Sequence, residues 1–141
     1  MNAYINGINE NKDKVFQFHR FLSIDESNLN LSNSIISSTY AYDHGGAIES
    51  HNSNLIIQNS SFIGCESSTG GAIVIWCSGM KVCTTNLSDN NFTNNFASLQ
   101  GGAIYYDSYI PLGLENNSYS ENFSPYGVNY GSYAVNVNFI R

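Results

Sequence analysis

Three identical tetrapeptides, Gly-Gly-Ala-Ile, recur along this chain, and their repetition limits the fold more than any other feature. They begin at Gly45, Gly70 and Gly101, so their spacings are 25 and 31 residues. A degenerate fourth copy is predicted at 131–135, Gly-Ser-Tyr-Ala-Val. A repeat of this length indicates a solenoid, in which each unit buries its apolar side chains only by stacking on its neighbours.

The segments that precede each tetrapeptide also match one another. Five positions before each Gly-Gly pair stand Tyr40, Cys65 and Phe96, and eight or nine positions before it stand Ile36, Phe62 and Phe92. Apolar and polar residues alternate with a period of two, which indicates short strands. About three such strands per unit is typical of one coil of a parallel β-helix, whose coils stack at about 4.8 Å. An ordinary β-sandwich with chance Gly-Gly turns is the alternative.

The predicted fold is therefore all-β, a single parallel β-solenoid domain of about four to five coils. Residues 1–29 are expected to form an N-terminal coil or cap, followed by repeats at about 30–54, 55–85, 86–114 and 115–141. Tight turns are predicted at Gly45, Gly46, Gly70, Gly71, Gly101 and Gly102, because glycine tolerates positive φ. Asparagines in the other turns are expected to adopt left-handed conformations and to form amide ladders along the stack.

The three cysteines predict one disulfide. Cys77 and Cys83 are six residues apart, and the 31-residue spacing exceeds the 25-residue spacing by the same number. We interpret residues 77–83 as a loop inserted into a standard coil and closed by a Cys77–Cys83 bridge. Cys65, in the position shared with Tyr40 and Phe96, is expected to be a buried thiol. Three reduced cysteines in a cytosolic protein are the alternative, and the spacing does not suit a zinc site.

These repeats resemble those of a known family. Gly-Gly-Ala-Ile, together with Phe92-Thr93-Asn94-Asn95 and Tyr119-Ser120-Glu121-Asn122, is similar to the GGAI and FxxN repeats of chlamydial polymorphic outer-membrane proteins. The resemblance covers roughly residues 30–135. It implies a right-handed, pectin-lyase-like parallel β-helix and a surface or adhesive role.

Several Asn-x-Ser/Thr triplets are candidate glycan acceptors. The predicted sites are Asn30, Asn59, Asn86, Asn91 and Asn116, whereas a sixth triplet at Asn122 occupies the FxxN position and is followed by Pro125. Asn30 and Asn86 each precede a Gly-Gly pair by 15 residues, which predicts equivalent positions on one face. Such sites and the disulfide favour an extracellular or cell-surface location over the cytosol that a start without a signal peptide suggests.

Charge and composition argue against several functions. The formal net charge is −6 and the chain has only five Lys and Arg residues, which do not form the cationic face that nucleic acid requires. No apolar run approaches the about 20 residues of a membrane-spanning helix, so membrane insertion is not expected.

The acidic residues are spread at one or two per predicted coil and show no paired-Asp motif, so no catalytic residues, metal site or cofactor are predicted. His44 and His51, which flank the first Gly-Gly pair, are expected to face solvent. Strand alternation predicts that the outward positions are Glu49, Val74 and Tyr105. An exposed aromatic surface is expected to comprise Trp76, Tyr105, Tyr109, Tyr126 and Tyr130, with internal aromatic ladders as the alternative.

We therefore predict a non-catalytic, extracellular structural or adhesive repeat protein. Uncapped strand-like ends would allow head-to-tail stacking into a filament or surface coat. The alternative is a fragment of a longer solenoid, whose missing neighbours supply the caps. Glycans or cell-surface proteins are the other expected partners. The alternative is a carbohydrate-binding or polysaccharide-cleaving β-helix, which a groove with three or more clustered carboxylates would favour.

Overall fold

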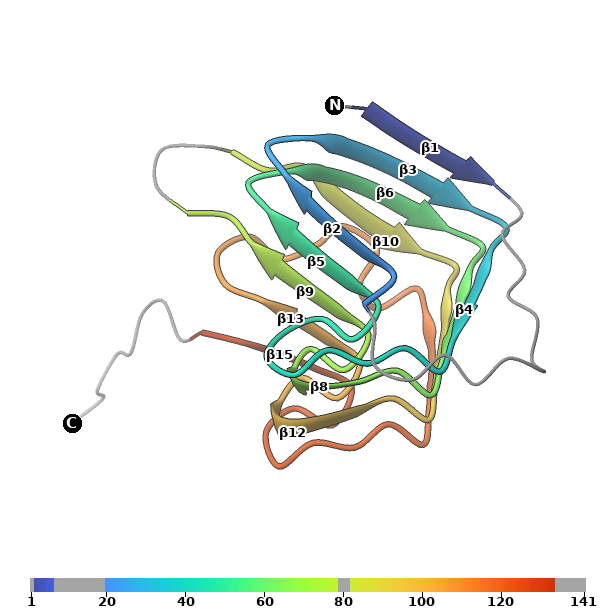
Figure 1. Cartoon of the computed structure of the whole chain (residues 1–141), viewed down its shortest axis with the longest axis vertical. Coiled ribbons are helices and arrows are strands. Elements are labelled where there is room, and N and C mark those ends of the chain that lie inside the picture. The colour runs from blue at the N-terminus through green and yellow to red at the C-terminus, as the bar shows by residue number, and fades with distance from the viewer. Residues whose placement is uncertain (1, 7–19, 79–81, 134–141) are drawn as a thin grey trace.

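A computed structural model describes residues 2–6, 20–78 and 82–133 of the chain. The described residues form 15 strands and no helix. The strands are stacked in parallel, coil upon coil, as a β-solenoid of about four turns (Figure 1). The predicted all-β solenoid is confirmed, while its handedness stays a prediction.

Equivalent strands of successive coils pair into four parallel sheets. The first sheet contains β1 (Asn2–Asn6), β3 (Asn28–Ser32), β6 (Asn54–Gln58) and β10 (Thr85–Ser88). The second contains β4 (Ile35–Ser37), β7 (Ser61–Ile63), β11 (Asn91–Thr93) and β14 (Ser118–Ser120). The third contains β8 (Glu66–Thr69) and β12 (Phe96–Gln100). The fourth contains β2 (Leu22–Asp25), β5 (Ile48–His51), β9 (Ile73–Trp76), β13 (Ile104–Tyr106) and β15 (Tyr130–Ser132).

The core is built from columns of like side chains that run along the stack. The isoleucines of the three tetrapeptides, Ile48, Ile73 and Ile104, are in register and fully buried. A second column joins Ile36, Phe62, Phe92 and Tyr119, and the Phe62 and Phe92 rings stack at 5.1 Å between centroids. Each coil therefore covers the apolar side of the next, as the repeat predicted.

The two glycines of each pair are required for different reasons, which Gly70 and Gly71 illustrate. Gly70 has φ of +62°, in the left-handed region that favours glycine. Gly71 has no positive φ, but a Cβ there would lie 2.1 Å from the carbonyl oxygen of Gly102 in the next coil. The first glycine makes the turn, and the second allows adjacent coils to stack at strand distance.

Asparagine side chains link consecutive coils in one direction. The Asn95 Oδ1 accepts the N–H of Cys65 at 2.9 Å, and its Nδ2 donates to the Phe62 carbonyl at 3.0 Å, both in the preceding coil. Asn122 repeats this pattern one coil later, accepting the N–H of Asn95 at 3.0 Å and donating to the Phe92 carbonyl at 3.0 Å. The predicted amide ladder is confirmed.

The difference in coil length is divided between two places. From Ile73 to Thr85 is 12 residues, whereas their partners Ile48 and Leu55 are seven apart. The corner after β9 thus holds five extra residues, not the predicted six. The sixth lies in β12, where three positions from Ala97 to Gln100 face two positions in β8 and the register shifts.

Two sequence-based alignments were wrong, the first because of this bulge. Phe96 pairs with Glu66, not with Cys65, so Cys65 lies in the Asn95 ladder position and not in the aromatic one. The fourth copy is residues 127–130, Gly-Val-Asn-Tyr, because Tyr130 pairs with Ile104 and Gly102 donates to the Gly127 carbonyl. The prediction at 131–135 was wrong, since it assumed that the long spacing continued; residues 134 and 135 lie outside the described residues.

Candidate functional site

The predicted glycan acceptors lie on the surface of the stack. Asn30 and Asn86 belong to one column of the first sheet, with Ile56 of the intervening coil between them. This places them two coils apart on the same face, as their spacing predicted. The exposed acceptors are Asn30, Asn59, Asn91 and Asn116, while Asn86 is half-buried.

Asn122 differs from the other triplets because its amide is already engaged. The residue is 6% exposed, and its Nδ2 donates to Phe92 and to the Asn129 side chain. Glycan attachment would require this Nδ2 to leave the buried ladder, so the fold disfavours modification at this position.

A disulfide joins Cys77 and Cys83, with their Cα atoms 6.1 Å apart, at the corner that carries the five extra residues. The predicted pairing is confirmed. Both half-cystines are buried, and the N–H of Cys77 donates to the Asp107 carboxylate at 2.8 Å. Cys65 is fully buried as a thiol, as expected, although in a different ladder from the predicted one.

A group of ionisable and aromatic side chains lies on the outer face of the fourth sheet. The Arg20 Nη2 pairs with the Glu49 carboxylate at 2.5 Å and donates to the His44 carbonyl at 2.9 Å. The opposite Glu49 oxygen is 2.5 Å from the His51 Nε2. Arg20 thereby fastens the turn at His44 to strand β5, which carries Glu49.

Trp76 organises the aromatic half of this group. Its ring lies edge-on to His44 at 5.3 Å, alongside His51 at 6.5 Å and against Tyr105 at 5.4 Å. Both histidines are half-buried, and the His51 side chain is 39% exposed, so the expectation that they face solvent holds only in part. Among the described residues no three His, Cys, Asp or Glu side chains are grouped as a metal site requires.

The aromatic side chains around Trp76 bury residues that alternation places on the outer face of the fourth sheet, as Tyr105 shows. Tyr105 and Val74 are outside the central core cluster, as alternation predicted, yet both are fully buried. Burial raises the pKa of Tyr105 to about 12, with smaller contributions from Tyr133 and Asp107. Of the predicted exposed aromatics, Tyr109 and Tyr126 are exposed and Trp76 and Tyr130 are half-buried. The exposure predicted for Tyr105 was wrong, because the covering residues come from distant parts of the sequence.

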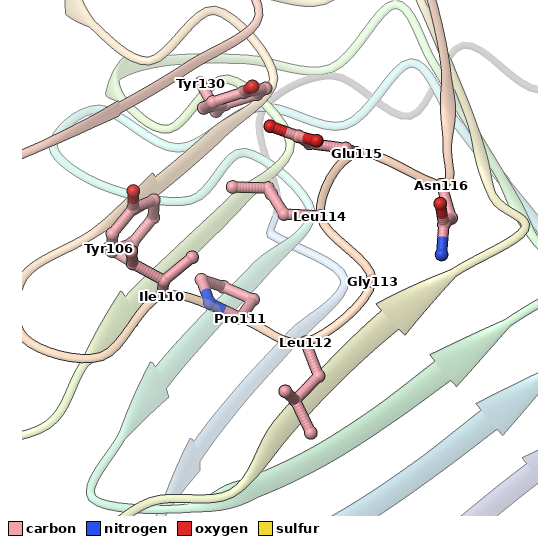
Figure 2. A pocket seen from close by; sticks show the side chains of 9 residues that line it. All are labelled: Tyr106, Ile110, Pro111, Leu112, Gly113, Leu114, Glu115, Asn116 and Tyr130. Atoms are coloured by element: carbon pink, nitrogen blue, oxygen red, sulfur yellow. The ribbon is translucent and has the colours of Figure 1, made fainter.

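A cavity of about 500 Å³ opens at the C-terminal coil (Figure 2). Its walls include Tyr106 on β13, Tyr130 on β15 and Leu114 on the connecting segment. Tyr106 and Tyr130 pack against the core cluster, of which Leu114 is a member. The connecting segment forms no strand in the first sheet and pairs with its backbone at an isolated bridge between Leu112 and Asn86. The cavity is thus the place where the core reaches the end of the described stack.

Comparison with known proteins matches part of the chain to a repeat family. Residues 91–107 fit the family model of the Chlamydia polymorphic membrane protein repeat, a segment that includes both Phe92–Asn95 and the third Gly-Gly-Ala-Ile. No curated protein and no solved structure matched the chain. The chain therefore carries a repeat of the polymorphic membrane protein type, and this surface-protein family supports a cell-surface location in general terms. The pectin-lyase-like part of the resemblance stays a prediction.

No helix among the described residues is long and apolar enough to cross a bilayer.

Proposed function

We propose that this chain, a β-solenoid with a polymorphic-membrane-protein repeat, is a non-catalytic structural or adhesive module of a surface protein. The hydrogen bonds and ion pairs of its polar side chains support this role. Arg20, Asp107 and the ladder asparagines all bond to other parts of the same stack, where they fix one coil on the next. A role as scaffold follows from side chains used in this way.

The observation that carries the proposal is the direction of the asparagine ladders. Each asparagine accepts an N–H from the preceding coil, so in the last described coil no described side chain accepts the corresponding N–H groups. Within the described residues, the N–H groups of Asn117 and Asn122 have no hydrogen-bond partner. β14 and β15 are edge strands of their sheets at the same end. Unpaired edges of this kind attract further strands, which supports end-to-end contact with a second copy.

Light scattering coupled to size exclusion tests this contact over a range of protein concentrations. We expect the mass to rise above 15.5 kDa with concentration. Replacing Ser118 and Ser120 by lysine on edge strand β14 should keep the protein monomeric, because lysines on an edge oppose pairing. The matched control variant carries the same lysine replacements at Asn91 and Thr93, the partners of Ser118 and Ser120 on the inner strand β11. This variant should still associate. A wild-type protein that stays monomeric throughout would overturn end-to-end association.

Glycans on the exposed acceptors are a second part of the proposal. Expression in a eukaryotic secretory host, followed by intact mass before and after deglycosylation, should show a mass loss. Peptide mapping should place sugar on acceptors such as Asn59 and none on Asn122. An unchanged mass after deglycosylation would remove the glycoprotein assignment while leaving the stacking contact untouched.

A further inference from the structure

One column on the outer face of the third sheet interrupts an aromatic ladder with a carboxylate. Tyr40 pairs with Glu66, Glu66 with Phe96, and Phe96 with Phe123, each one coil apart. The Phe96 and Phe123 rings stack at 5.6 Å with planes 10° apart. Glu66 occupies the level at which a ring would continue this stack.

The missing ring leaves a hollow of about 310 Å³. Its lining includes Tyr40, Tyr42, Glu66 and Phe96, together with three serines. Two strand spacings separate the levels of Tyr40 and Phe96, which is about 9.6 Å. A group at the level of Glu66 would therefore lie about 4.8 Å from each aromatic level, within the about 6 Å range of cation–π attraction.

The charge of the hollow is not neutralised by the described chain. The Glu66 side chain is exposed and makes no hydrogen bond or ion pair there. The only Lys or Arg among the described residues is Arg20, which is held by Glu49. A carboxylate between aromatic levels, on a chain of net charge −6, is complementary to an organic cation.

We propose that this hollow binds a lysine or arginine side chain of a partner protein. The ammonium or guanidinium group pairs with the Glu66 carboxylate while its faces or attached methylenes contact Tyr40 and Phe96. The sequence could not reveal the site, because the β12 bulge hides the alignment of Glu66 with Phe96. The inference is independent of end-to-end stacking, which uses a different surface.

Amide-resolved NMR titration of the ¹⁵N-labelled protein tests the proposal with a Gly-Lys-Gly peptide. We expect perturbations centred on Tyr40, Glu66 and Phe96. The same peptide with Nε-acetyl-lysine, which lacks only the charge, should produce none of them. Glu66→Gln and Phe96→Leu should each weaken binding by about threefold or more, since either contact contributes roughly 0.5–1 kcal/mol.

Asp89→Asn is the matched control, because Asp89 is an exposed carboxylate on another corner of the coil. It should leave the affinity unchanged. Equal weakening by Glu66→Gln and Asp89→Asn would mean that the peptide senses only overall charge, and would overturn the site. Perturbation of the same amides by a neutral methyl glycoside but not by the lysine peptide would overturn it in favour of a sugar.

Discussion

At the residue scale, this protein uses one side chain for several stacking bonds. Asn95 is 1% exposed and satisfies a donor and an acceptor of the preceding coil as well as contacting the next asparagine. Buried backbone groups that lose their partners cost about 1–3 kcal/mol each. The ladder position is therefore more demanding than its small, polar residue suggests.

Replacing Asn95 by alanine should lower the free energy of unfolding by about 1–3 kcal/mol, because the buried Cys65 N–H loses its partner and the Phe62 carbonyl loses one of its donors. Chemical denaturation monitored by circular dichroism measures this change. Asn91→Ala in the same coil, at an exposed position, should change stability by no more than about 0.5 kcal/mol. Similar losses in both variants would show that the ladder bonds add little.

At the element scale, the turns and strands were predictable to different degrees. The Gly-Gly turns and the Ile and Phe columns followed from identical residues at regular spacing. The bulge in β12 did not, because Ser98 and Leu99 add one residue without the glycine or proline that marks most irregularities. A single uncounted residue then shifted the alignment of Cys65, which shows how strongly a solenoid assignment depends on register.

The outer face of the fourth sheet was also beyond sequence reasoning. Alternation correctly placed Val74 and Tyr105 away from the core cluster, but their burial depends on Trp76, Tyr133 and the turn fastened by Arg20. These contacts join segments whose association no local pattern encodes. The Glu66 hollow is a further case, since its residues come from three coils.

The close approach of the next coil to the second glycine of each pair can be tested by substitution. Gly71→Ala should prevent folding or cost more than about 3 kcal/mol, because the new Cβ meets backbone oxygens of the next coil at 2.1 and 2.7 Å. Gly64→Ala is the comparison. Its Cβ would have nothing within 4 Å, and only its φ of +65° opposes the substitution, which costs about 1 kcal/mol. Thermal melting of the two variants should separate them clearly; equal melting temperatures would contradict the close-approach explanation.

At the scale of the whole molecule, the two ends of the described stack differ in chemistry. Tyrosines replace isoleucine and phenylalanine in the last coil, where Tyr119 donates its hydroxyl to the Leu114 carbonyl at 2.5 Å. Both prolines of the chain, Pro111 and Pro125, also lie in this coil. Proline lacks the N–H that a further strand would need, so stacking on this end is expected to run through β14 and β15.

Two tyrosines, Tyr105 and Tyr119, should make the free energy of unfolding fall at alkaline pH. Burial raises the pKa of Tyr105 and Tyr119 from 10.0 to about 12. The folded state thus keeps protons that the unfolded chain releases, so the stabilisation is complete below pH 10 and is lost as the pH rises from 10 to 12. Denaturation midpoints measured across this range should fall. Tyr119→Phe should flatten the decline, whereas Tyr126→Phe, at an exposed ring, should follow the wild type.

The five extra residues after β9 show that the number of residues in a coil can change without changing the packing of the core. The coil that begins at Ile73 is longer than its predecessor, yet β9, β10 and β11 keep their partners. Because the added chain leaves and returns at one corner closed by the Cys77–Cys83 bridge, length can vary there without disturbing any column. That corner is consequently where a foreign peptide could be displayed on an unchanged scaffold.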